Sequence, residues 1–277
     1  MQMKRILYWV AIGFLSLVII VCGTMIAQKL ITDARDKADN EHLVATLDER
    51  PILTTGPENT SEPDDTIPSP TEPDSAEPPT EPPTEPSILF RYQALYEMNN
   101  DMVGFIEIPG TSVKYPVVQS KYEANFYLRK NFYKVGASCG TIYVREACDV
   151  FEPSDNVTIY GHKMRNGTMF ADLHLYKDKD FWEENRIIFF DTLYEYHNYE
   201  IFAVFQTEAN QPDSFNYHMF DDARNAEEFD KFVETCKGLS YYDTGITPEY
   251  GDKLITLSTC DKSIEEGRLV VVARRIQ

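Results

Sequence analysis

An uncharged run of 22 residues, from Ile6 to Ala27, lies close to the N-terminus and is rich in Leu, Ile, Val and Phe. As an α-helix it would be about 33 Å long, enough to cross the hydrocarbon core of a bilayer. Lys4 and Arg5 precede it, which predicts a cytoplasmic N-terminus. A cleaved signal peptide is the alternative, but the run is long for one and no small-x-small cleavage site follows. We expect residues 1–27 to form a cytoplasmic tip and an uncleaved transmembrane anchor, with the remaining chain outside the cell.

Two further segments separate this anchor from the rest of the chain. Residues 28–50 are polar and lack Pro and Gly, so we expect an exposed juxtamembrane helix. Residues 51–86 hold nine Asp or Glu, no Lys or Arg, and eleven of the sixteen prolines, with Thr-Glu-Pro at 71–73, 80–82 and 84–86. Such a composition cannot bury a core and keeps a chain extended, to at most about 110 Å here. We interpret this segment as a disordered linker or stalk; a Pro-rich recognition motif is the alternative.

Charge and cysteine content narrow the possible functions. The net charge of −19 argues against nucleic acid as a partner, because such binding needs Lys and Arg. Cys22 lies in the apolar run, and the bulky Val21 before it disfavours lipidation, so we expect a buried membrane cysteine. A Cys139–Cys148 disulfide is conceivable outside the cell, but spacing alone cannot establish its geometry. Because five is an odd number, at least one unpaired thiol remains as a candidate nucleophile.

Residues 87–277 have the pattern of a mainly β domain. Ser87 is expected to cap a short helix carrying Leu89, Tyr92, Leu95 and Tyr96 at helical spacing. Two more helices are expected near 168–176 and 226–237, the second with Cys236 on its buried stripe. Eight strands are predicted at 103–108, 112–118, 140–144, 156–160, 187–191, 194–207, 253–259 and 268–275, with residues 194–199 interpreted as an aromatic hairpin. This number of strands in about 190 residues predicts one closed β-barrel with short helices.

Three polar residues stand at the ends of these predicted strands. Gly161 ends an apolar strand and places His162 at the edge of the barrel. Cys260 stands at the end of another apolar strand, which contains Leu254, Ile255 and Leu257. Arg268 opens the last strand after a polar loop, so antiparallel pairing of the last two strands would set Cys260 beside Arg268. A thiolate, an imidazole and a guanidinium together support acyl transfer, as nucleophile, proton carrier and oxyanion donor. A cationic neighbour also favours the thiolate.

Each of these signals is weak by itself. A cysteine in a strand is more often a small core residue, and an isolated histidine or arginine near a strand end usually lies at the surface. The joint occurrence of all three at strand ends outweighs those interpretations. The other histidines show no paired ligand pattern, so we expect neither a metal nor a cofactor.

The motifs around these residues resemble the sortase family, class B most closely, over roughly residues 88–277. The matching stretches are Asp101–Thr111, Tyr115–Gln119, Tyr160–Met164, Gly167–Phe170, Thr256–Cys260 and Gly267–Val271. The helix at 226–237, before the cysteine-bearing strand, is also similar to class B.

The resemblance implies a role for each matched position. His162 corresponds to the catalytic histidine, Cys260 to the nucleophile and Arg268 to the oxyanion-stabilising arginine. Leu128, Tyr160 and Ser258 correspond to residues that line the substrate groove. The family often has Asp-Asn before the Tyr-Leu pair, where this chain has Glu123-Ala124-Asn125, so no asparagine role is carried over. Asp261 is less favoured than Arg268 as a third catalytic residue, because its side chain is expected on the opposite face.

The resemblance further implies a membrane-anchored cysteine transpeptidase. It would cleave a C-terminal sorting motif of exported proteins after Thr, hold the acyl group on Cys260 and pass it to an amine of a cell-wall precursor or of a pilin lysine. A papain-like cell-wall peptidase is the first alternative, but its cysteine precedes its histidine in the chain. The Ser-His-Gly-Cys-x-Arg signature of L,D-transpeptidases is absent. A stalked adhesion or sensor domain is the non-enzymatic alternative, and it would have no reactive thiol at Cys260.

Overall fold

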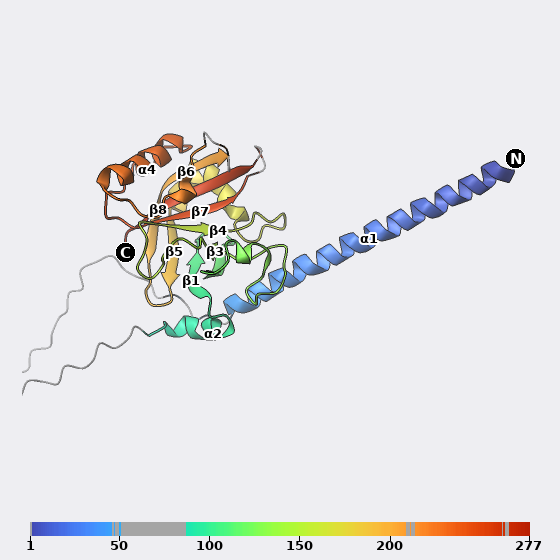
Figure 1. Cartoon of the computed structure of the whole chain (residues 1–277), viewed down its shortest axis with the longest axis horizontal. Helices are drawn as coiled ribbons and strands as arrows, with labels where there is room; N and C mark the ends of the chain where they lie inside the picture. Colours follow the sequence, from blue (N-terminus) through green and yellow to red (C-terminus); the bar gives the residue numbers. More distant parts are fainter. Residues whose placement is uncertain are drawn as a thin grey trace, which may run out of the picture. The chain divides into compact units, whose positions relative to one another are not determined.

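A closed eight-stranded barrel forms the folded body of this computed structural model, as predicted (Figure 1). The structure describes residues 2–45, 47, 50, 87–208, 211, 214–261, 263 and 266–277. Neighbouring strands follow the order β1-β2-β3-β4-β7-β8-β6-β5. Their bounds are β1 Met102–Glu107, β2 Lys114–Val118, β3 Tyr143–Val144, β4 Asn156–Tyr160, β5 Ile187–Thr192, β6 Asn198–Glu208, β7 Leu254–Cys260 and β8 Gly267–Arg275.

The helical elements are α1 Gln2–Ala45, α2 Phe90–Met98, α3 Lys179–Glu184 and α4 Ala226–Leu239, with 3₁₀ turns η1 Phe126–Arg129, η2 Ala171–Lys177 and η3 Tyr217–Met219. The helix expected near 168–176 is therefore the 3₁₀ turn η2, and α3 was not predicted. Ser87 does not cap α2, because Leu89 holds the N-cap position without a side-chain bond. β6 begins at Asn198 rather than at residue 194, since Tyr194 and Glu195 turn back through backbone N–H bonds to the Thr192 hydroxyl.

Strand β8 is apolar on both faces because both faces are covered. Val271 joins the main core inside the barrel, whereas Val270 and Val272 join a second cluster with Phe229 and Phe232 of α4. Cys236 lies in that second cluster and is fully buried, as the helical stripe predicted. Helix α4 thus covers the outer face of the strands that lead to the candidate site.

Helix α1 continues beyond the apolar run to Ala45, as expected for the juxtamembrane segment. Within the described residues, its stretch Leu7–Ala45 is the one helix long and apolar enough to cross a membrane. The segment is not wholly exposed, because Leu43 is buried and packs in a cluster with residues of α2, β1 and β2. The predicted linker at 51–86 lies outside the described residues.

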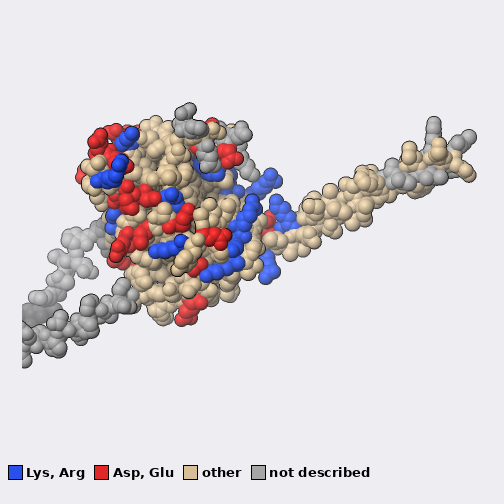
Figure 2. Space-filling view, in the orientation of Figure 1, with Lys and Arg blue, Asp and Glu red and all other residues tan. Residues whose placement is uncertain are grey.

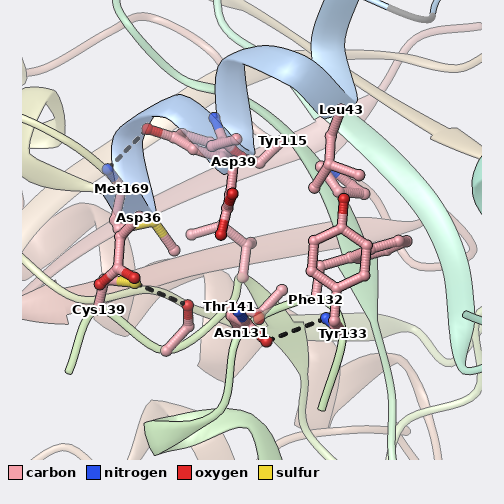
Figure 3. Close-up of a pocket in the computed structure, with 14 residues that line it drawn as sticks. Asp36, Asp39, Leu43, Tyr115, Asn131, Phe132, Tyr133, Cys139, Thr141 and Met169 are labelled. Carbon is pink, nitrogen blue, oxygen red and sulfur yellow. Dashed lines mark hydrogen bonds between the residues drawn. The ribbon is translucent and has the colours of Figure 1, made fainter. Parts of the chain in front are cut away.

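One face of α1 contacts the barrel. Asp36, Asp39 and Leu43, which are spaced three or four residues apart, line a small pocket with Tyr115 and Cys139 (Figure 3). All cysteines of the chain are free thiols, so the conceivable Cys139–Cys148 disulfide is not formed. Because Leu43 is buried against the barrel domain, α1 and the barrel belong to one compact unit.

The barrel seam between β4 and β7 yields a first prediction. The Thr256 hydroxyl donates a 2.7 Å bond to the Asn156 side-chain oxygen, and both residues are fully buried. In Thr256→Val that oxygen loses its donor, so the free energy of unfolding should fall by about 1–3 kcal/mol. Urea unfolding measures this loss, with Thr235→Val, at a partly exposed position of α4, as the control. A Thr256→Val chain as stable as the control would show that this bond contributes nothing.

Candidate active site

The three predicted residues at strand ends meet on neighbouring strands. Cys260 is the last residue of β7, and its register partner on antiparallel β8 is Arg268, as the loop between them predicted. On the other side, β7 runs parallel to β4, with Ser258 beside Tyr160. His162 follows Tyr160 by two residues, and therefore reaches the same barrel end as Cys260.

Gly161 allows His162 to leave the strand at this point. A Cβ on Gly161 would lie 2.5 Å from side-chain atoms of both Ile142 and Phe170, closer than any side chain can approach. Its N–H donates a 3.1 Å bond to the Ser258 carbonyl, which prolongs the pairing of β4 with β7 by one residue. Glycine is therefore required here for two reasons: any side chain would collide with Ile142 and Phe170, and the strand ends at this position.

The His162 ring is held by two partners. Its Nε2 donates a 2.8 Å hydrogen bond to the Leu128 carbonyl, and because a carbonyl only accepts, this bond keeps a proton on Nε2. The ring also shares a hydrogen bond with Cys260, which is the main cause that raises the pKa of His162 above its usual value; burial opposes this rise. The charged imidazolium is therefore favoured beside the thiol, an arrangement that suits proton transfer.

The guanidinium of Arg268 lines the same cleft, and only part of it is hydrogen-bonded. Its Nη1 donates to the carbonyls of Glu266, at 3.2 Å, and Gly267, at 3.0 Å. Within the described residues no other polar partner of this side chain is found, so its Nε and Nη2 hydrogens are free to bind an oxygen.

All six predicted site residues line one cleft of about 480 Å³. They are His162, Cys260, Arg268, Leu128, Tyr160 and Ser258. The cleft is open at the barrel end, and its walls carry both polar and aromatic side chains. A cleft of this size accommodates a short extended peptide segment beside the thiol.

Several cleft residues have no signal in the sequence. Tyr217 lies in η3, inside an irregular connection between β6 and α4, and shares a 2.6 Å hydrogen bond with the hydroxyl of Ser258. Arg145 holds this connection in place through bonds of 2.5 and 2.6 Å to the Asp221 carboxylate. Tyr143 stacks at a tilt on Tyr160, with ring centroids 5.4 Å apart. Only tertiary contacts bring these side chains to the cleft.

Asp261 turns away from the thiol, as its position after the strand predicted. It is 3 % exposed and accepts a 2.5 Å bond from Lys177 of η2, together with bonds from the N–H and hydroxyl of Ser263. Burial raises its pKa, but the bonds from Lys177 and Ser263 prevail and lower it to about 2. Beside it, His174 Nε2 donates to the Cys260 carbonyl at 3.3 Å. These contacts fasten the backbone around Cys260 from outside the cleft.

The other three thiols of the barrel domain lie in a different environment. Burial raises the pKa of Cys139 and of Cys148 to about 12 and that of Cys236 well above its usual value. These three thiols are buried, whereas Cys260 is partly exposed. Thiolate chemistry at neutral pH is therefore disfavoured at the buried three.

Known proteins share this architecture. A family model described as a sortase domain matches residues 106–276. The sortase B of Listeria monocytogenes is 34% identical over 185 residues, which cover 66% of this chain and 72% of that protein. A Staphylococcus aureus sortase B–substrate complex superimposes with a TM-score of 0.62 and 30% identity, covering 69% of this chain and 87% of that one. A sortase B complexed with triglycine gives a TM-score of 0.62 and 28% identity, covering 70% and 88%.

The contact between His162 and Cys260 yields a second prediction. Cys260→Ala removes the main cause that raises the pKa of His162 but leaves its burial, which lowers that pKa. The pKa of His162 should therefore fall, as measured by NMR titration of the imidazole in the full chain. His218 of the same cleft is the internal control, because Cys260 is not among the causes of its shift. An unchanged or higher pKa of His162 would show that the two side chains do not interact.

Proposed function

Because the chain belongs to the sortase family of cysteine transpeptidases, in class B, we propose that it joins exported proteins to an amine acceptor outside the cell. In this proposal Cys260, His162 and Arg268 are the catalytic residues. The observation that carries it is the register of β7 with β8 and β4, which sets the thiol beside the guanidinium and the imidazole at the mouth of the cleft.

The first half of the reaction forms a thioester. The Cys260 thiolate attacks the carbonyl carbon of a peptide bond after Thr, and the carbonyl electrons move onto the oxygen. Arg268 donates hydrogen bonds from its free N–H groups to this oxyanion, which lowers the barrier. The intermediate collapses with cleavage of the C–N bond, and His162 gives its proton to the departing amine. The acyl group then remains on the Cys260 sulfur.

The second half transfers that acyl group. An amine attacks the thioester carbonyl, His162 accepts the proton that this amine loses, and the Cys260 thiolate leaves, which restores the starting state. Two complexes of relatives support these two partners: one sortase B holds a substrate and another holds triglycine. We assign the acceptor to a cell-wall precursor; the ε-amine of a pilin lysine is the alternative.

Leu128, Tyr160 and Ser258 are proposed to bind the sorting motif. All three line the cleft, Tyr160 from β4, Ser258 from β7 and Leu128 from η1. Tyr217 joins them, since its hydroxyl meets that of Ser258. The side chain of Leu128 is 38% exposed, which leaves an apolar surface beside His162 for a substrate side chain.

The apolar part of α1 is proposed as an uncleaved anchor, with the N-terminus in the cytoplasm and the barrel outside. The most apolar 18-residue stretch of this helix is not buried by other described residues, which is consistent with a lipid-facing helix. The location of the substrates, exported proteins and wall precursors, is consistent with this topology.

Mass spectrometry of the full chain in detergent tests the proposal. With a peptide containing Thr-Gly or Thr-Asn and no amine, we expect a covalent adduct on Cys260. With added triglycine or a diaminopimelate-type amine, the adduct should disappear and a ligated peptide should form. A preference for a lysine ε-amine would favour pilin assembly. Fast hydrolysis that no amine affects, without an adduct, would contradict transpeptidation.

Arg268→Lys yields a separate prediction. Lysine keeps the charge but loses the planar fork of donors, so kcat should fall by about 10²–10³-fold. Arg275→Lys, the same change at the far end of β8, is the matched control and should retain the wild-type rate. Steady-state cleavage of a motif peptide measures both. Wild-type turnover in Arg268→Lys would remove this arginine from the mechanism.

A further inference from the structure

A second pocket, of about 510 Å³, lies between α1 and the loop that follows His162. We call it the juxtamembrane pocket. Its lining comes from four residues of α1 and five residues of the barrel domain, which are Ile26, Lys29, Leu30, Asp33, Ser138, Lys163, Met164, Arg165 and Asn166. The cleft with Cys260 is lined by a different set of residues, so this pocket is not part of it.

The position of the pocket along α1 places it at the edge of the apolar run. That run ends at Ala27, and at 1.5 Å per residue Lys29 lies about 3 Å and Asp33 about 9 Å beyond it. The headgroup layer of a bilayer is roughly 5–8 Å deep on each side of its hydrocarbon core. If α1 crosses the membrane as proposed above, the pocket is at the depth of the phospholipid headgroups.

The charges in the pocket are opposite to those of the chain as a whole. Lys29, Lys163 and Arg165 are exposed, and within the described residues none of the three forms an ion pair. Asp33 is the one acidic residue of the lining, which leaves an excess of two positive charges in a chain whose net charge is −19. In Figure 2, Lys and Arg side chains gather where α1 meets the barrel.

Apolar side chains complete the lining. Ile26 and Leu30 stand on the same face of α1 and are exposed, and Met164 faces them from the loop between the two barrel cations. A lipid offers a phosphate group and, directly below it, apolar chains. The three cations and the three apolar side chains of the lining match both parts, whereas a free anion would leave the apolar side chains without a partner.

We propose that the juxtamembrane pocket binds the headgroup of an anionic membrane phospholipid, with its phosphate on Lys29, Lys163 and Arg165. The inference rests on the membrane-spanning part of the proposed function. It bears on the active site because Lys163 directly follows His162 and pairs with Met169 across the loop. Phe170 also donates its N–H to the His162 carbonyl at 2.9 Å. A lipid in the pocket would thus fasten the loop that carries His162 to the membrane surface.

Hydrogen–deuterium exchange of the full chain in lipid nanodiscs tests the proposal. One preparation contains phosphatidylcholine only, and the other contains phosphatidylcholine with about one third phosphatidylglycerol. We expect amides of residues 163–167 to exchange several-fold more slowly with phosphatidylglycerol present. The Lys163→Gln/Arg165→Gln double variant should lose this protection, because the phosphate loses two of its three cations.

The matched control is Lys231→Gln on the exposed face of α4, which should keep the protection. Equal exchange in the two lipids, or protection that survives the double variant, would overturn the proposal. Failure of the proposed function is separately visible: a chain that alkaline carbonate extracts from membranes has no transmembrane anchor, and a chain without a Cys260 adduct in detergent is no transpeptidase. Neither readout depends on phosphatidylglycerol.

Discussion

The register of β7 with its two neighbours is the constraint on which the candidate site depends. β7 pairs in parallel with β4 and antiparallel with β8, so Tyr160, Ser258 and Val270 lie in one row across the sheet. Side chains alternate between the faces of a strand, and a slip of one residue would turn Cys260 to the other face. Closure of the barrel and the apolar cover on both faces of β8 prevent such a slip.

The parts of the fold that local pattern specifies were predicted from the sequence. The bounds of β4 are identical to the prediction, and those of β7 and β8 differ by one residue at the ends. These strands are apolar runs with clear ends: Gly161 follows β4, and Gly267 begins β8. Because Cys260, His162 and Arg268 stand at those ends, their convergence in one cleft followed from the strand pattern, whereas their family roles came from the resemblance.

The irregular walls of the cleft were not predictable in the same way. Tyr217 reaches Ser258 from a connection without periodicity, and its position depends on the pair of Arg145 with Asp221, 76 residues apart in the chain. The start of β6 was predicted too early because the aromatic-rich segment after residue 193 has strand propensity. In the structure the backbone N–H groups of Tyr194 and Glu195 donate to the Thr192 hydroxyl and form a turn instead. The helix predicted over residues 28–50 is present as far as Ala45, but it is not wholly exposed, because Leu43 is buried by a tertiary contact that the polar sequence does not indicate.

The central claim is that the fold activates one thiol among several by setting it beside His162 at an open strand end. Alkylation of the full chain by iodoacetamide at neutral pH, followed by peptide mapping, tests this claim most directly. The account predicts that Cys260 reacts at least about tenfold faster than Cys139, Cys148 and Cys236, and that His162→Gln removes most of this advantage. Equal rates at these four cysteines of the barrel domain, or a Cys260 rate that does not depend on His162, would contradict it.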